Sequence, residues 1–326
     1  MDETILEIDH SLTMKLSSKA ILGTIVCLIV IVLMSNETKN DIPLTPQEQL
    51  ISGMQLTFND DFDTFKQYLD PNGDETCGTD GAGVWQTLYY NCTRTTASNN
   101  EAQIYIDRTF IKYFNEHTSP NLPTTSKFPF SISDGVLRIE ATPSDTVIQS
   151  GIGPWAKYTS GMITTQHYFS QQYGYFEIRA KLPKGKGLWP AFWLLPVDTS
   201  WPPEIDAMEA FGDTNSVNGE GGEAMIHYAS HFNPNNSICG AWHDTGTDVT
   251  ADFHTYGVDW EPESITYYFD GQPYANCPHN ADADKPFYIL VNLAVGGEGS
   301  WPGTPDATNI WPAYLEIDYV RAYQKK

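Results

Sequence analysis

Residues 173–182 read YGYFEIRAKL, and this stretch decides the fold class. Its even positions from 176 to 182 are apolar, whereas its odd positions from 177 to 181 are charged. Alternation with a period of two predicts a β-strand with one buried face. The segments 137–142 and 314–323 also predict strands, and 265–269 leads into the hairpin turn Asp270-Gly271. Short antiparallel strands between Gly and Pro turns, over about 270 residues, predict an all-β two-sheet sandwich or jelly roll.

The composition limits the kinds of partner that the chain can bind. It has 326 residues, with 18 Lys and Arg against 41 Asp and Glu, and its formal net charge is −23. Such a chain lacks the basic surface of a nucleic-acid-binding protein, and it disfavours anionic polymers and anionic membrane surfaces. Aromatic residues make up 13% of the chain. Their abundance favours an uncharged ligand that stacks on aromatic rings. For the oligomeric state, we expect a monomer.

The first 35 residues form a separate segment. The run Ala20–Met34 is apolar and uncharged, and Lys15 and Lys19 precede it. A basic stretch before an apolar one is typical of a secretory signal, and the run is shorter than the about 20 residues of a full membrane span. A cleaved signal peptide is favoured, and an uncleaved type II signal anchor, with the N-terminus in the cytoplasm, is the alternative. In either case the rest of the chain lies outside the cytosol, secreted or membrane-anchored.

Residues 36–54 are polar and contain prolines, so we expect a linker there and one large domain over residues 55–326. The four cysteines beyond residue 35 are even in number, which suits an oxidising compartment. Their sequence leaves three pairings open, and closeness along the chain favours Cys77–Cys92 with Cys239–Cys277. Sequons for N-glycosylation occur at Asn36, Asn91 and Asn235.

The segment WPPEIDAME, residues 201–209, holds three carboxylates that could do chemistry. Glu204 and Asp206 share one face of a regular strand, and Glu209 points to that face only if a β-bulge at 207–208 adds one residue. The two glutamates would then stand about four strand positions apart. Their side chains could approach the ~5–5.5 Å that retaining glycosidases need between two carboxyl groups. Mutual repulsion would raise at least one pKa, as a general acid near neutral pH requires.

Aromatic residues occur close to this acidic segment. Trp189 and Trp193 lie upstream in GLWPAFW, residues 187–193, while His227 and Trp301 lie downstream. Tryptophan flanked by Gly and Pro is unusual for a buried strand and suits a platform on which sugar rings stack. The adjacent Phe192 and Trp193 point to opposite faces of a strand, so Trp193 also has a core interpretation.

Eight segments follow one another along the chain: NNEAQIYID (99–107), SISDGVLRIEA (131–141), YTSGMITT (158–165), YGYFEIRAKLPKGKGLWPAFWLLP (173–196), PPEIDAMEAFGD (202–213), FHTYGVDWEPESITYYFDG (253–271), FYILVNLAVGG (287–297) and YLEIDYVRAYQ (314–324). In this order they resemble glycoside hydrolase family 16, the laminarinase and β-glucanase group. The resemblance implies an antiparallel β-jelly-roll sandwich, concanavalin A-like, with a concave substrate cleft. Residues 55–326 would then be the catalytic domain.

The resemblance also assigns roles. It makes Glu204 the nucleophile, Glu209 the general acid/base and Asp206 the residue that modulates the nucleophile, with no cofactor for catalysis. It implies substrate contacts from the positions Trp189, Trp193, His227, Trp301, Asn100, Glu101 and Gln103. A structural calcium ion on the convex side would involve Asp318 and backbone oxygens near Asp60 and Gly135.

The function that the resemblance implies is a retaining endo-β-glycanase acting on the neutral polysaccharides β-1,3-glucan or β-1,3/1,4-glucan. Two departures leave the substrate open: Met162 stands where many laminarinases carry Arg, and Trp201-Pro202-Pro203 is closer to members that act on exopolysaccharides. A galactan or a microbial exopolysaccharide is therefore an alternative substrate. A transglycosylase is the alternative reaction, and a lectin-like carbohydrate-binding domain is the non-enzyme alternative, because fold alone does not fix function.

Overall fold

The computed structural model describes residues 43–117, 128–213, 220–232 and 237–326. Residues 44–326 form one compact unit. Within the described part of the chain, no helix combines the length and the apolar character needed to cross a membrane. The predicted signal or anchor segment, Ala20–Met34, lies outside the described residues, as do the sequons at Asn36 and Asn235.

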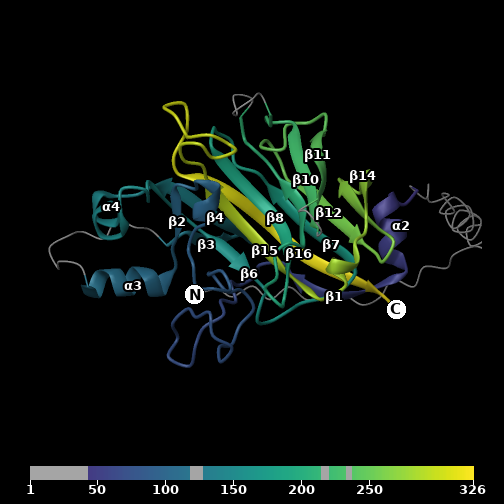
Figure 1. Cartoon of the computed structure of the whole chain (residues 1–326), viewed down its shortest axis with the longest axis horizontal. Coiled ribbons are helices and arrows are strands. Elements are labelled where there is room, and N and C mark those ends of the chain that lie inside the picture. Colours follow the sequence, from purple (N-terminus) through teal and green to yellow (C-terminus); the bar gives the residue numbers. More distant parts are fainter. Residues whose placement is uncertain (1–42, 118–127, 214–219, 233–236) are drawn as a thin grey trace, which may run out of the picture. The chain divides into compact units, whose positions relative to one another are not determined.

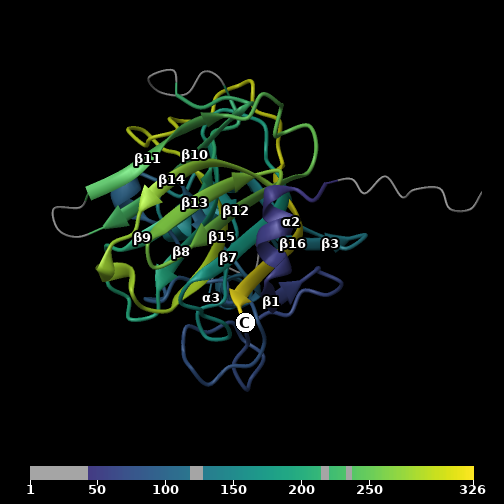
Figure 2. The ribbon, with the colours of Figure 1, turned by 90° about the vertical axis from the view of Figure 1, so that its right-hand side faces the viewer.

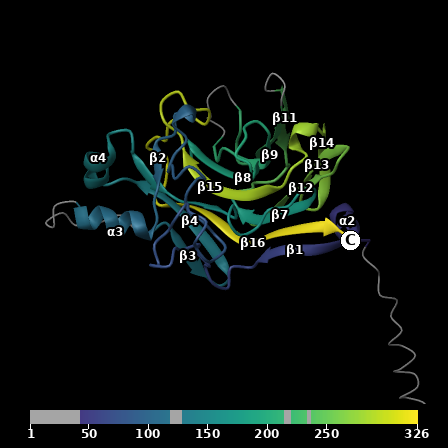
Figure 3. The ribbon, with the colours of Figure 1, turned by 60° about the horizontal axis from the view of Figure 1, so that its bottom comes forward.

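Two sheets packed face to face make up the unit, as the alternating segments predicted (Figure 3). The larger sheet runs in the order β14 (Gln272–Pro278), β13 (Ser264–Phe269), β12 (His254–Trp260), β7 (Gly174–Lys181), β16 (Ala313–Lys325), β4 (Val136–Pro143), β5 (Tyr158–Ser160) and β2 (Gln103–Tyr105). Strand β1 (Met54–Asp60) pairs with β16, and β3 (Phe130–Ser133) pairs with β4. The smaller sheet runs β11 (Ser237–Asp244), β10 (Met225–Phe232), β9 (Glu204–Glu209), β8 (Leu188–Pro196), β15 (Phe287–Val295) and β6 (Met162–Thr164). Among the pairings between the strands named above, only β2 with β5 is parallel, so the architecture is the expected antiparallel jelly roll.

The core between the sheets is built by the alternation that the sequence displays. In β7, Phe176, Ile178 and Ala180 are fully buried in this core. Strand β15 is buried at every position. Its odd-numbered residues pack in the main core, whereas Tyr288 and Leu290 pack in a separate cluster with Trp193 on the opposite face. The smaller sheet therefore carries a second layer of side chains, which forms the floor of a cleft.

In the described part of the chain, three α-helices lie at the ends of the sandwich. Helices α3 (Arg108–His117) and α4 (Thr146–Ile152) lie at one end, and α2 (Pro46–Ser52) lies at the other (Figure 1). Short 3-10 helices occupy Ala97–Asn99 and Ala281–Ala283. The end-on view in Figure 2 shows α2 beside β1 and β16.

Helix α2 occupies a stretch for which the sequence predicted a linker. Thr45 and Glu48 form a capping box, with Pro46 in the first turn, which together start a helix. Leu50 and Ile51 pack against a small cluster that contains Met54. Because two apolar side chains are partly buried in this way, the chain is already ordered several residues before β1.

Both predicted disulfides are present, Cys77–Cys92 and Cys239–Cys277. Cys239 belongs to β11 of the smaller sheet and Cys277 to β14 of the larger one. The second disulfide therefore joins the two sheets at one edge of the sandwich.

Candidate active site

The predicted β-bulge is present in β9. Along β8 the partners of Phe192 and Trp193 are Met208 and Asp206, so one step on β8 corresponds to two on β9. On the other side, two steps on β10 correspond to three on β9. The extra residue on β9 is Ala207.

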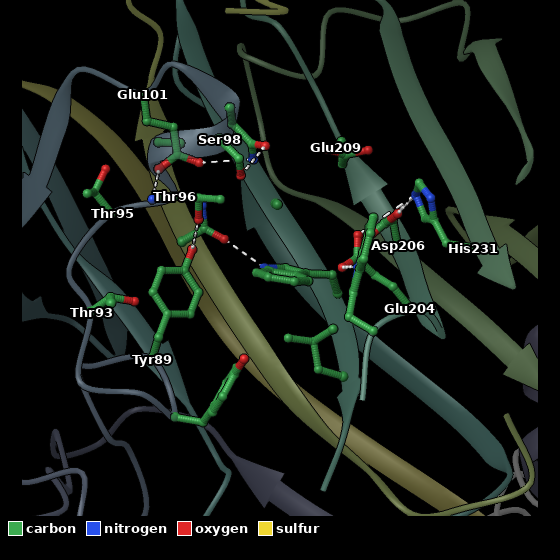
Figure 4. Close-up of a pocket in the computed structure, with 18 of the residues that line it drawn as sticks. Tyr89, Thr93, Thr95, Thr96, Ser98, Glu101, Glu204, Asp206, Glu209 and His231 are labelled. Carbon is green, nitrogen blue, oxygen red and sulfur yellow. Dashed lines mark hydrogen bonds and ion pairs between the residues drawn. The ribbon is translucent and has the colours of Figure 1, made fainter. Parts of the chain in front are cut away.

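The bulge sorts the side chains of β9 between two environments. Ile205, Ala207 and Met208 are fully buried in the core between the sheets. Glu204, Asp206 and Glu209 instead line a cleft of about 860 Å³ on the opposite face of the smaller sheet. The strand therefore presents all three carboxylates to one open space, as the bulged spacing predicted (Figure 4).

Glu209 is held at both of its carboxylate oxygens. Trp189 Nε1 donates to Oε1 at 2.9 Å, and His227 Nδ1 lies 3.1 Å from Oε2. The rings of these two residues pack edge-on against Trp301, with centroids 5.7 and 4.9 Å away. Phe211 completes this aromatic cluster, with its centroid 4.6 Å from that of Trp301. Rigid rings with ring nitrogens facing one carboxylate fix its position.

Glu204 has different surroundings. Trp201 Nε1 donates to Oε2 at 2.8 Å, and His231 Nε2 lies 3.8 Å from Oε1. His231 Nε2 is closer to Asp206 Oδ2, at 3.1 Å. The Asp206 side chain retains only 4% of its exposure. Figure 4 shows Glu204, Asp206 and His231 together and Glu209 at the other end of the strand.

Burial controls the ionisation of the Glu204–Asp206 pair. Burial, followed by the charge of Asp206, raises the pKa of Glu204 well above its ordinary value, while His231 and the Trp201 hydrogen bond oppose the rise. Burial and the charge of Glu209 raise the pKa of Asp206 well above its ordinary value. Two neighbouring buried carboxyl groups do not both ionise readily, so ionisation of one opposes ionisation of the other.

The predicted substrate-binding residues divide into two groups. Trp189, Trp193, Trp301, His227 and Glu101 line the cleft. In contrast, Asn100 and Gln103 support it from outside. Asn100 Nδ2 donates to Gly299 O, and the fully buried Gln103 donates to Glu101 Oε2 at 2.6 Å.

The predicted tryptophans have protein partners as well as a face on the cleft. Trp193 Nε1 donates to Asn292 Oδ1 at 2.7 Å, which places its ring on the cleft floor. Phe192, its neighbour, is buried in the core. The Trp301 Nε1 atom donates to Glu220 Oε2 at 2.9 Å.

Several residues of the cleft were not among those predicted from the sequence. Trp201 and His231 contact the Glu204–Asp206 pair, and Tyr89, Tyr288 and Asn292 line the floor. Trp201 was read only as part of a family signature, although it is 57% exposed beside Glu204. His231 follows His227 by four residues, and that spacing keeps the same face of a regular strand.

The residues expected near a calcium ion lie on the larger sheet, away from this cleft. Asp318 pairs with Arg179 Nη1. Asp60 is buried and accepts hydrogen bonds from Phe62 N and Trp85 Nε1. Both carboxylates are therefore engaged with donors, and the calcium ion, which was predicted to use backbone oxygens near Asp60 and Gly135, stays a prediction. Gly135 lies nearby, and a Cβ at that position would be 3.8 Å from Asp61 O.

Ligand atoms of Glu204, Asp206 and His231 lie within 4.8 Å of one another, close enough to share a cation. Metal-binding imidazoles donate their second ring N–H to an acceptor. The His231 Nδ1 atom is buried and has no hydrogen-bond partner among the described residues. The trio therefore lacks the outer support of a metal centre, and its contacts suit the control of a proton.

Comparison with known sequences agrees with this geometry. The sequence profile described as glycosyl hydrolases family 16 matches residues 86–321, most of the chain. The chain belongs to glycosyl hydrolase family 16. The matched region includes all three carboxylates of β9, together with Trp189, His227 and His231.

Named proteins and solved structures resemble the chain over most of its length. The endo-1,3-1,4-beta-glycanases EglC and ExsH of Rhizobium meliloti (strain 1021) are 39% and 38% identical over 277 and 278 residues, 83% of this chain. The alignments cover 52% of each of these relatives, so the chain spans about half the length of the curated relatives it matches. The laminarinase catalytic domain from Thermotoga maritima MSB8 superposes with a TM-score of 0.61 at 29% identity, covering 84% of this chain and 99% of that domain.

Proposed function

We propose that this chain is a retaining endo-β-glycanase that hydrolyses β-1,3-glucan or β-1,3/1,4-glucan by double displacement. The observation that carries the proposal is the bulged strand β9, which presents Glu204, Asp206 and Glu209 to one cleft. The names of relatives support the substrate class, since EglC and ExsH are endo-1,3-1,4-beta-glycanases and the Thermotoga protein is a laminarinase.

In the first step, Glu209 donates a proton to the glycosidic oxygen while Glu204 attacks the anomeric carbon. The bond from that carbon to the leaving oxygen breaks, and an ester bond to a Glu204 oxygen forms. In the second step, Glu209 removes a proton from water, the water oxygen attacks the anomeric carbon, and Glu204 leaves as a carboxylate. Two inversions at one carbon give net retention.

The surroundings of the three carboxylates support these roles. Glu204 needs to be ionised to attack, and the hydrogen bond that Trp201 Nε1 donates to Glu204 Oε2 favours the ionised form. Glu209 has to be positioned accurately to donate and accept a proton, and Trp189 and His227 contact both of its carboxylate oxygens. No step requires a cofactor.

The cleft supports action within a chain rather than at its end. It is lined by residues from β8, β9, β10 and β15 and by the loops 89–101 and 199–201. Tyr90, Trp201 and Ile238 line it with 41%, 57% and 58% of their surfaces exposed. Exposed aromatic and apolar surface in the cleft suits several consecutive sugar rings.

The test is stereochemical. Proton NMR during hydrolysis of laminarin should detect the β-anomer of the new reducing end before mutarotation. An initial α-anomer would contradict double displacement and the role of Glu204. A parallel panel of laminarin, mixed-linkage β-glucan, galactan and an acidic exopolysaccharide identifies the substrate, and the largest kcat/KM should fall on one of the first two.

A transglycosylase on the same site is the second candidate, because a sugar hydroxyl can replace water in the second step. The exposed rings of Trp201 and Tyr90 at the cleft favour it, since they offer stacking surface for an acceptor sugar. Products longer than the substrate at high oligosaccharide concentration would identify this activity. A lectin-like domain has no use for three carboxylates at one bulge, and complete absence of turnover would favour it.

Secretion or type II anchoring of the chain remains a proposal that rests on residues 1–35 and on the disulfides. The two disulfides support an oxidising compartment outside the cytosol. Expression of the full chain in a secretory host, with separation of medium and membrane fractions, distinguishes a cleaved signal from an anchor. In that experiment size-exclusion chromatography also tests the expected monomer.

A structural calcium ion near Asp318 would have to displace the guanidinium of Arg179. Addition of EGTA, with the melting temperature as the readout, tests this part of the family resemblance. If calcium stabilises the chain, EGTA lowers the melting temperature, and excess Ca²⁺ restores it.

A further inference from the structure

His231 makes two contacts at the Glu204 end of β9. Its Nε2 atom lies 3.1 Å from Asp206 Oδ2 and 3.8 Å from Glu204 Oε1. Its ring also packs against Trp201, with centroids 6.2 Å apart, and Trp201 donates to the other Glu204 oxygen. His231 therefore reaches both members of the carboxyl pair from the neighbouring strand β10.

The position of His231 is fixed by strand register. His231 is the partner of Glu204 across β9 and β10, and it lies opposite Ile238 of β11. Its side chain retains 18% of its exposure, so the ring is mostly enclosed. Because the His231 ring is already mostly enclosed, it loses little further conformational entropy when it forms the hydrogen bond to Asp206.

The tautomer of His231 follows from its surroundings. The Nδ1 atom is buried without a partner among the described residues. A buried N–H without an acceptor costs about 1–3 kcal/mol, whereas a proton on Nε2 faces two carboxyl groups. We therefore assign the imidazole proton to Nε2, which donates to Asp206 Oδ2.

We propose that His231 is a positioning residue that keeps the Glu204–Asp206 pair singly ionised, because its Nε2–H faces both carboxyl groups, 3.1 Å from Asp206 Oδ2 and 3.8 Å from Glu204 Oε1. An N–H donor stabilises the anionic form of the pair relative to its fully protonated form. Without it, burial alone would keep both protons on the pair to a higher pH, and Glu204 could not attack. The inference rests on the proposed function and deepens it.

Few other groups near His231 could stabilise the singly ionised form of the Glu204–Asp206 pair. Strand β9 contributes Glu204 and Asp206, with Glu209 further along the same strand. Strand β11 contributes the uncharged Ile238 opposite it. Beneath β10, the buried Tyr267 hydroxyl bonds to Ser230 Oγ and Ala229 O, and the charge of Asp206 is among the causes that raise the pKa of Tyr267, after burial. His227, on the same strand, bonds to Glu209.

The test compares His231→Leu with His231→Gln. Leucine keeps the volume and removes the donor, whereas glutamine carries an N–H₂ that can reach the place of Nε2. For His231→Leu we expect kcat at neutral pH to fall about tenfold or more. The acid limb of its pH–rate profile should move to higher pH by about one unit. For His231→Gln the acid limb should stay near the wild-type position, with KM little changed in both.

The matched control is His243→Leu. His243 lies on β11, where its ring stacks on Tyr274 with centroids 4.0 Å apart, and it is not among the residues of the cleft. Its replacement should leave the pH–rate profile unchanged. Melting temperatures of all three variants identify any general loss of folding.

Two outcomes would overturn the inference. One is a His231→Leu profile that superimposes on the wild-type profile, and the other is a loss of kcat without movement of the acid limb. Failure of the proposed function is separate, because Glu204→Gln is measured in the same assay. If Glu204→Gln turns over like the wild type, the catalytic assignment fails. If Glu204→Gln is inactive and His231→Leu behaves like the wild type, only the role of His231 fails.

Discussion

The two ends of β9 carry the same side chain in opposite surroundings. Glu209 meets ring nitrogens at both oxygens, within an aromatic cluster. Glu204 has a second carboxyl group, Asp206, as its neighbour, and burial raises the pKa of both groups. One strand therefore supplies two different chemical roles. Position is controlled at the Glu209 end, and ionisation is controlled at the Glu204 end.

The largest effects are expected when either glutamate loses its carboxylate. Glu204→Gln and Glu209→Gln should each lower kcat by about 10³-fold or more, because each removes one partner of both steps. With an activated aryl β-glycoside, added azide should restore turnover of Glu209→Gln and give a β-glycosyl azide, since azide needs no general base. Azide should not restore turnover in this way for Glu204→Gln. Equal rescue of the two variants by azide would contradict the different roles proposed for Glu204 and Glu209.

Asp206→Asn should have the next largest effect, with kcat reduced about 10²-fold. The charge of Asp206 helps to raise the pKa of Glu204. Its removal lowers that pKa, so the ionised nucleophile persists to lower pH and the acid limb moves downward. The expected direction is opposite to that for His231→Leu. A pH–rate profile measures both, and shifts in the same direction would contradict our description of the Glu204 end.

Trp189→Phe tests the other end of the strand. The ring stays in the cluster with Phe211 and Trp301, while the N–H donor to Glu209 is lost. We expect kcat on polysaccharide to fall about tenfold, since the acid loses one of its two anchors. An aryl glycoside with a good leaving group needs little protonation, so its turnover should fall less. The matched control is Trp301→Phe, which loses a hydrogen bond to Glu220 instead. If Trp189→Phe lost the same factor in kcat on the polysaccharide and on the aryl glycoside, the result would argue against a positioning role for Trp189.

The smallest effect on turnover is expected for the double variant Cys239→Ser, Cys277→Ser. This disulfide joins β11 to β14 and lies one residue from Ile238, the cross-strand partner of His231. Its loss should destabilise the fold by about 2–4 kcal/mol, seen as a lower melting temperature. Turnover at 25 °C should stay close to that of the wild type, because β9 keeps its partners on both sides. A large loss of kcat at unchanged melting temperature would mean that the Glu204 end depends on the sheet edge.

The sequence predicted those features that depend on local pattern. Alternation over 173–182 predicted β7, the bulge at Ala207 followed from the need to align Glu209 with Glu204, and closeness predicted the disulfides. The strand and the bulge require knowledge of one strand only, and the disulfide pairing follows from sequence separations of 15 and 38 residues.

Features that depend on contacts between distant segments were not predictable in this way. The role of His231 requires the register of β9 against β10, which no single segment encodes. The sequence left Trp193 between cleft and core, and its place on the cleft floor depends on the Asn292 side chain of β15. Residues 46–52 were predicted as linker because they are polar, and their helix is stabilised by burial of Leu50 and Ile51 against the domain.

The bulge at Ala207 also has a consequence for insertions and deletions in this strand. Ala207 is the extra residue, and its side chain faces the core together with Ile205 and Met208. A strand that lost this one residue would read Glu-Ile-Asp-Met-Glu, and regular alternation would still place its three acidic residues on one face. A one-residue deletion usually reverses every side chain beyond it. Here the strand has two lengths that are compatible with the same acidic face, so its length can change during evolution without passing through an inverted arrangement.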